Sequence, residues 1–122
     1  MAAPVPPSTI LLKLEREIAG GVQHLLLLRL IDQQGAAHGY GLIRGMDEVT
    51  GMRGLWKEGT IYPVLAAMER EGLVRSRWGA EEAGPRRKYY ELTQAGRHAL
   101  RLCALQWREL RDTMDRLLEA YA

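Results

Sequence analysis

The sequence holds little of what several classes of protein require. Its single cysteine in 122 residues excludes a disulfide framework within the chain and agrees with a reducing compartment. The longest unbroken aliphatic run, residues 25–28, ends at Arg29, far short of the roughly 20 apolar residues that span a bilayer. Residues 1–8 have neither a basic stretch nor a long apolar run, so we interpret them as a disordered lead rather than a signal peptide. We therefore expect a cytoplasmic protein with no membrane partner.

Residues suited to catalysis or metal binding are equally scarce. Cys103 has no histidine at a useful helical spacing, because His98 lies five residues before it. His24, His38 and His98 form no cluster with carboxylates or cysteine at metal-ligand spacing. We expect no enzymatic activity, no cofactor and no metal site within one chain, and a metal site built across a dimer stays open.

The positive charge of the chain is concentrated in one region. The formal net charge is only +2, on a length that suits one domain with a modest core. Residues 1–71 carry 7 cations and 8 carboxylates, whereas residues 75–101 carry seven cations and three carboxylates, a local balance of +4. Basic charge gathered in this way is typical of a nucleic-acid-binding surface.

Three helices are predicted before residue 72. The first, capped by Ser8 or Thr9, covers residues 10–34; its stretch from 22 to 31 is apolar on nearly every face, which predicts a buried helix. Gly20 and Gly21 each cost about 1 kcal/mol in a helix interior, so we expect a kink or break there. The second lies between glycines 35 and 51. The third ends before Gly72 and should begin near residues 58–60 or be distorted in its first turn, because Pro63 lacks an amide donor.

After Gly72 the apolar period changes from helical to alternating. Residues 73–78 and 87–92 alternate as two strands, joined by turn residues 79–85. Thr93 is placed to cap a long helix over residues 94–122. Three helices followed by a basic hairpin is the order of a winged helix-turn-helix. The predicted fold class is α+β, mostly α: a winged-helix domain over residues 9–93 with a long carboxy-terminal dimerisation helix.

Several motifs also resemble one family, the PadR transcriptional regulators. They are HGYGL, GTIYPVLAAMEREGLV, RSRW, GPRRKYYELTQAG and the later Trp107, and they cover roughly residues 22–110. Because a single helix follows the hairpin, the chain resembles the short subfamily of these regulators. The resemblance implies a homodimeric repressor that binds pseudo-palindromic operators and is released by a small, often aromatic ligand. It assigns no role to the first helix before Val22.

The third helix is expected to enter the major groove of double-stranded DNA, while the hairpin contacts the neighbouring backbone or minor groove. Cations at a hairpin's edge can neutralise phosphates, and tyrosine hydroxyls can donate to them. For Tyr40 the phosphate contact is implied by the resemblance alone. The predicted DNA-binding residues are Tyr40, Lys57, Thr60, Tyr62, Pro63, Arg86, Arg87, Lys88 and Tyr89.

Each of these assignments has an alternative. The basic hairpin can instead be a solvated charged surface without a ligand. Tyr40 can be a half-buried aromatic that only packs, and Thr60 and Tyr62 can be ordinary residues of the first helical turn. Trp78 shares its strand face with Val74, so we expect it in the core of the hairpin.

The carboxy-terminal helix carries an apolar heptad seam. A helix of about 28 residues extends roughly 42 Å, more than a short domain can cover, so the simplest partner is a second copy. The alternative is that this face covers the domain's own core. The predicted dimer-interface residues are Leu100, Cys103, Trp107, Leu110, Met114, Leu117 and Tyr121.

Trp107 stands in the middle of this seam. The resemblance associates its position with an apolar pocket at the dimer centre, which predicts that Trp107 binds a small planar aromatic effector; the alternative is that it only packs the dimer. We therefore predict a dimeric DNA-binding regulator. A winged-helix module that assembles with proteins without reading DNA is the competing interpretation.

Overall fold

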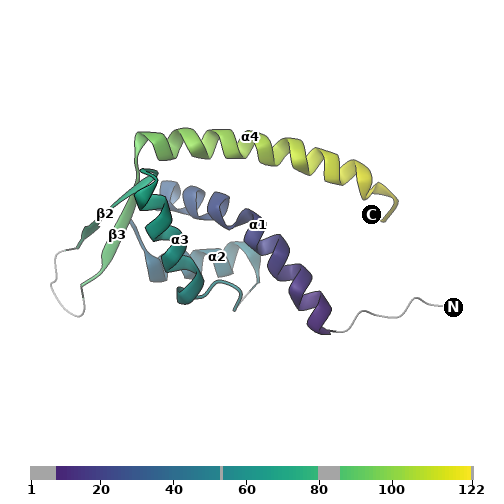
Figure 1. Cartoon of the computed structure of the whole chain (residues 1–122), viewed down its shortest axis with the longest axis horizontal. Coiled ribbons are helices and arrows are strands. Elements are labelled where there is room, and N and C mark those ends of the chain that lie inside the picture. The colour runs from purple at the N-terminus through teal and green to yellow at the C-terminus, as the bar shows by residue number, and fades with distance from the viewer. Residues whose placement is uncertain (1–7, 53, 80–85, 122) are drawn as a thin grey trace.

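The computed structural model describes residues 8–52, 54–79 and 86–121, and it is mostly helical with one small sheet (Figure 1). The expected lead, apart from Ser8, and most of the expected turn at 79–85 lie outside the described residues. The predicted winged-helix fold class is confirmed. The elements are α1 (Ser8–Gln34), β1 (Ala37–His38), α2 (Gly39–Thr50), α3 (Glu58–Arg70), β2 (Val74–Trp78), β3 (Lys88–Leu92), α4 (Gln94–Leu117) and the 3-10 turn η1 (Glu119–Tyr121).

The helix α1 is continuous, so the break expected at Gly20 and Gly21 is not found. An ideal Cβ at either glycine would meet no atom within 4 Å, so neither glycine serves a close approach. Core contacts hold the helix on both sides of the pair, because Ala19 before it and Leu27 and Ile31 after it are buried. Burying a large aliphatic side chain contributes about 1.5–3 kcal/mol, which exceeds the cost of about 1 kcal/mol for each glycine.

The start of α3 confirms the prediction made from Pro63. The helix begins at Glu58, and the amides of Thr60 and Ile61 both donate to the carbonyl of Lys57, at 2.9 and 2.8 Å. Pro63 therefore lies in the second turn. The side chain of Lys57, the N-cap residue, makes no capping hydrogen bond, so it is free to extend away from the helix.

The sheet is antiparallel with the strand order β1-β3-β2. The strand β1, which the sequence pattern did not indicate, pairs Ala37 with Tyr90 and His38 with Tyr89. Because side chains alternate along a strand, Tyr90 points into the core while Tyr89 points to the other face. The short strand thus brings the start of α2 beside β2, β3 and residues 86–87, which together form the wing.

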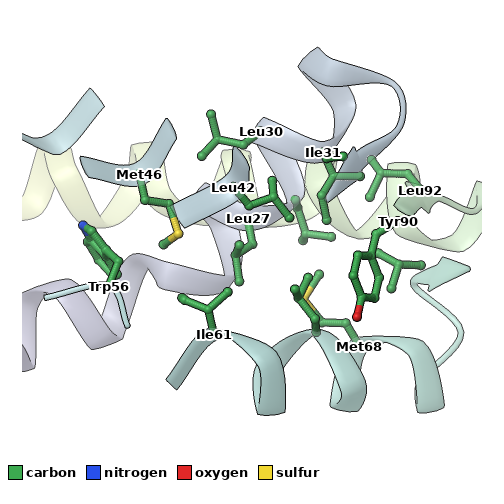
Figure 2. Packing of buried hydrophobic residues seen from close by; sticks show 14 of the residues in the cluster. Leu27, Leu30, Ile31, Leu42, Met46, Trp56, Ile61, Met68, Tyr90 and Leu92 are labelled. Atoms are coloured by element: carbon green, nitrogen blue, oxygen red, sulfur yellow. The ribbon is translucent and has the colours of Figure 1, made fainter. Parts of the chain in front are cut away.

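The core lies where the first three helices meet the sheet (Figure 2). Residues from α1, α2, α3 and β3 interdigitate, and Trp56 closes one end. The Trp56 indole N–H donates to Thr50 Oγ1 at 3.1 Å, which satisfies the polar end of a ring that is only 3% exposed. Among the large side chains, those with the least exposure are Leu27, Ile31, Leu42, Met46, Ile61, Leu65, Met68 and Val74.

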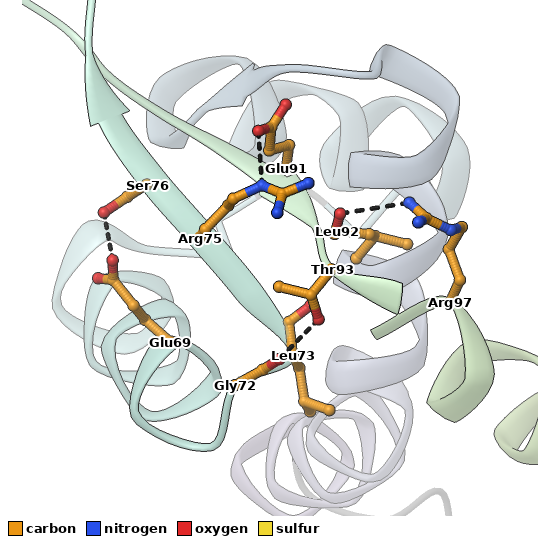
Figure 3. A network of polar contacts seen from close by, with 9 residues as sticks. All are labelled: Glu69, Gly72, Leu73, Arg75, Ser76, Glu91, Leu92, Thr93 and Arg97. Carbon is orange, nitrogen blue, oxygen red and sulfur yellow. Dashed lines mark hydrogen bonds and ion pairs between the residues drawn. The ribbon is translucent and has the colours of Figure 1, made fainter. Parts of the chain in front are cut away.

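The helix α4 begins against the domain and then extends beyond it (Figure 1). Thr93 Oγ1 accepts from the Gly96 amide at 3.0 Å and donates to the Gly72 carbonyl at 2.6 Å (Figure 3), so the predicted cap is confirmed. The helix ends at Leu117, earlier than the expected residue 122, and Tyr121 lies in η1. Its 24 residues extend roughly 36 Å.

Candidate nucleic-acid interface

Five of the predicted DNA-binding residues meet at one concavity of about 490 Å³, formed by the start of α2, the start of α3 and the wing. Arg86, Arg87 and Lys88 come from the wing side, and two tyrosines come from the helices. The lining residues are His38, Gly39, Tyr40, Tyr62, Trp78, Arg86, Arg87, Lys88 and Tyr90. The fold therefore gathers cationic and hydroxyl donors beside the exposed start of α3.

His38 is a site residue that the sequence analysis did not assign to DNA. It is the N-cap of α2, where its Nδ1 accepts from the Gly41 amide at 3.0 Å. A neutral imidazole that accepts at Nδ1 carries its proton on Nε2. The Arg87 guanidinium lies 3.2 Å from that Nε2, so two donors face each other. An anion placed between them would accept from both.

The electrostatics of His38 agree with this arrangement. Burial, followed by the nearby Arg87 guanidinium, lowers the pKa of the His38 imidazole below its usual 6.5. The ring is therefore neutral near pH 7 in the free protein, and a bound anion would raise its pKa again. The signal that could have indicated His38 is its place just before a helix, where a side-chain acceptor caps free amides.

Glycine at position 39 lets α3 approach the start of α2. An ideal Cβ on Gly39 would lie 2.5 Å from the ring of Tyr62, so only glycine leaves room for that ring. Tyr62 itself remains 40% exposed. Tyr40 is 55% exposed, so it is not the half-buried packing aromatic that was the alternative to a DNA contact. The Arg44 guanidinium lies 5.8 Å from the centroid of its ring. Both tyrosines therefore line the concavity with part of their side chains exposed.

The expectation that Trp78 lies in the core of the hairpin is wrong. Trp78 does share a strand face with buried Val74, but its own side chain is 56% exposed. The reason is that Trp78 is at the far end of β2, beyond the stretch that packs on α3. The Arg86 guanidinium lies 5.6 Å from its ring centroid, and both residues line the concavity. The buried aromatic of the sheet is Tyr90 instead, and burial, followed by Glu69 and Tyr62, raises the pKa of its hydroxyl.

The three wing cations are not equivalent. Lys88 Nζ lies 3.7 Å from a Glu69 carboxylate oxygen, and the same carboxylate also accepts a hydrogen bond from Ser76 (Figure 3). The Ser76 hydrogen bond and then Lys88 lower the pKa of Glu69 below 4.5, against the opposing effect of its burial. Arg86 and Arg87 are exposed. Lys88 is thus partly neutralised within the chain, whereas the two arginines are the freer cations for a phosphate.

The remaining predicted DNA-binding residues lie outside this concavity. Tyr89 points to the opposite sheet face, with the Arg77 guanidinium 5.7 Å from its ring centroid. Pro63 is exposed on α3. Lys57 and Thr60 line a second concavity of about 390 Å³, between α3 and α1. Since Thr60 and Tyr62 are two residues apart in a helix, they point about 200° apart and occupy opposite flanks of α3.

The predicted dimer residues are mostly exposed along α4. Leu100 is the exception, because it packs against the core of its own chain. Trp107 is 41% exposed and lines a groove of about 750 Å³ between α4 and α1. The heptad pattern missed Leu102 and Leu105, which line the same groove from a second stripe of α4. The α1 residues of the groove are Gly21, Val22, His24 and Leu25.

Within residues 8–52, 54–79 and 86–121, no group of three His, Cys, Asp or Glu side chains is placed to hold a metal ion. In that same part of the chain, no helix combines the length and apolar character needed to cross a membrane.

Comparison with known proteins identifies the family. Residues 27–102 match the Transcriptional regulator PadR-like family. A PadR family transcriptional regulator from Eggerthella lenta DSM 2243 is 30% identical over 92% of this chain and 95% of that chain, with a TM-score of 0.77. A PadR-like transcriptional regulator from Bacillus cereus strain ATCC 14579 is 30% identical over 84% of this chain and 96% of that chain, with a TM-score of 0.72. An uncharacterized protein from Lysinibacillus sphaericus is 27% identical over 84% of this chain and 94% of that protein.

The family match spans more than half of the chain, and both structural relatives share its winged-helix architecture. Members of this family regulate transcription and are not enzymes. The chain therefore belongs to the PadR-like family of transcriptional regulators.

Proposed function

We propose that this regulator is a homodimeric repressor that acts in the cytoplasm and binds a pseudo-palindromic operator through α3 and the wing of each protomer. The observation that carries the DNA contact is the concavity where Tyr40, Tyr62, Arg86 and Arg87 converge beside the exposed start of α3. Arginine and tyrosine donors gathered at a helix that can enter a major groove suit phosphates flanking the bases that the helix reads.

A phosphate oxygen between His38 and Arg87 completes this interface. The two side chains present donors to the same point, with Arg87 Nη1 3.2 Å from His38 Nε2. Two donors at this distance gain little from each other, but a phosphate can accept from both, and charge-assisted hydrogen bonds are the stronger kind. Thr60 and Tyr62 then face the groove from opposite flanks of α3 and are the candidates for base or backbone contact.

Dimerisation is supported by the apolar surface of α4. Leu110, Met114 and Leu117 are 55%, 42% and 69% exposed. Large exposed apolar surfaces of this kind mark interaction sites, and a second copy covers them with the same residues. Such a dimer sets its two recognition helices about 34 Å apart, one turn of DNA, and a protein held there blocks polymerase.

The effector is proposed to bind at Trp107. The groove of about 750 Å³ has a size that accommodates a drug-sized ligand, and a planar aromatic compound stacked on an indole gains about 0.5–1.5 kcal/mol beyond area burial. Binding there releases the operator only if the effector prefers the dimer arrangement that misplaces the recognition helices.

Trp107→Ala should abolish fluorescence quenching by planar aromatic compounds while leaving the dimer intact; if Trp107 only packs, the same change should weaken the dimer. No quenching of the wild type across a broad panel refutes the ligand role.

The test of the proposed function is a mobility-shift titration on the duplex just upstream of this protein's own gene, repeated over a range of salt concentrations. The wild type should bind with a steep salt dependence. Arg87→Ala should flatten the slope of log K against log[salt] by about 0.9 for each phosphate that the variant no longer neutralises. Lys88→Ala is the matched control within the wing and should flatten the slope less, because Glu69 already partly neutralises that lysine. Absence of salt-dependent duplex binding by the wild type would favour the protein-interaction alternative.

A further inference from the structure

We propose that α1 is part of the DNA interface, with Arg16 binding a phosphate on the side of the major groove opposite the wing. The inference rests on the proposed function, because it takes α3 to be the helix in the groove. Arg16 lies before residue 27, where the family match begins, so the match assigns it no role.

The first observation is the shared concavity. Lys57 and Thr60, both predicted to contact DNA, line it from the start of α3, and Arg16 and Gln23 line it from α1. Arg16, Ala19, Gly20 and Gln23 recur at the i, i+3, i+4, i+7 spacing of a single helix face. That face of α1 therefore borders the concavity across from residues 54–57 and the first turn of α3, and Arg16 lines the same concavity as Thr60.

The second observation is the geometry of α3 itself. The concavity with the wing lies on the Tyr62 flank, and the concavity with Arg16 lies on the Thr60 flank. A helix with its side chains is about 10–12 Å wide and nearly fills a major groove of about 12 Å. The two phosphate backbones that border the groove therefore run along both flanks. The wing serves one backbone, and the other meets Arg16 and Lys57.

Charge supports the same assignment. Among the described residues, neither Arg16 nor Lys57 has a carboxylate within ion-pair distance, whereas Arg29 on the same helix pairs with Asp32 at 3.0 Å. Two cations that share a concavity repel each other, and a phosphate relieves that repulsion. The flexible Arg16 side chain can reach a backbone without any change in the helix.

The experiment compares Arg16→Ala with Arg29→Ala in the full chain on one duplex, between 50 and 200 mM salt. A dimer that neutralises two fewer phosphates should show a slope flatter by about 1.8, so the ratio of variant to wild-type Kd should shrink about twelve-fold over this range. Arg16→Lys should restore most of the slope, and Arg29→Ala should leave it unchanged. Phosphate-ethylation interference should disappear at one position per half-site in Arg16→Ala, on the backbone that the wing does not contact.

The outcomes separate the two proposals. An Arg16→Ala slope equal to that of the wild type overturns the role of Arg16, whatever happens to affinity, because a purely structural effect of Arg16 would change affinity without changing the slope. Arg16→Gln, which also suits an exposed helix position, provides the same readout if the alanine variant folds poorly. A wild type that binds no duplex in a salt-dependent manner instead refutes the proposed function itself.

Discussion

The junction between α4 and the winged-helix domain depends on the absence of a side chain at Gly96. An ideal Cβ there would lie 2.0 Å from the Leu73 carbonyl oxygen and 3.3 Å from Leu92 Cδ2. The first of these contacts is with backbone, so no side-chain rotation relieves it. In Gly96→Ala the first turn of α4 must therefore move away from the segment between α3 and β2.

The cost follows from what that movement breaks. Thr93 Oγ1 loses its hydrogen bond from the Gly96 amide, and the Thr93 amide loses its 3.1 Å bond to the Leu73 carbonyl. A missing N-cap costs about 1–2 kcal/mol and a missing backbone hydrogen bond about 1 kcal/mol. With some strain retained, the expected decrease in the free energy of unfolding is about 2–4 kcal/mol, which lowers Tm by roughly 8–16 °C for a chain of this size.

The assay is thermal unfolding followed by circular dichroism at a fixed protein concentration. Gly45→Ala is the matched control, because an ideal Cβ at that helical glycine lies at an ordinary 3.5 Å from Leu30 Cδ1. It should raise the free energy of unfolding by up to about 1 kcal/mol, through the better helix propensity of alanine. If Gly96→Ala melts within about 2 °C of the wild type, the backbone contact is not present in solution and the reasoning fails.

Three other predictions concern pH and the core. The Ser76 hydrogen bond and then Lys88 lower the pKa of Glu69. The stability that ionised Glu69 contributes is therefore present above about pH 4.5 and is lost as pH falls through the lowered pKa. In denaturant titrations at several pH values, Ser76→Ala should lose less of its free energy of unfolding on acidification than the wild type. A phosphate at His38 raises the pKa that burial and Arg87 lower, so DNA affinity should strengthen as pH falls from 8 to 6, and His38→Asn should remove much of that change in a mobility-shift series. In urea unfolding, Trp56→Phe should lower the free energy of unfolding by about 1–2 kcal/mol, because the indole hydrogen bond to Thr50 disappears. The blue-shifted part of the tryptophan fluorescence should also disappear, and an unchanged emission maximum would contradict the burial of Trp56.

Several site features depended on contacts between distant parts of the chain. His38 and Arg87 are 49 residues apart, and only the pairing of β1 with β3 brings them together. The periodicity that placed Trp78 on the inner strand face was correct, but it carried no information on where α3 stops covering that face. The sequence pattern likewise carried no information on the ion pair of Lys88, because its partner Glu69 lies on another element, α3.

The sequence by itself determined the order and type of the helices and strands between residues 39 and 117, the start of α3 and the cap at Thr93. These depend on local properties: glycine and proline conformations, apolar period and a hydroxyl before a helix. Tertiary structure decided the continuity of α1, the exposure of Trp78 and the placement of Arg16 beside α3. Each of these is set by which distant segments pack together, and packing free energy exceeds local propensity whenever large apolar side chains are buried, as Leu27 and Ile31 are in α1.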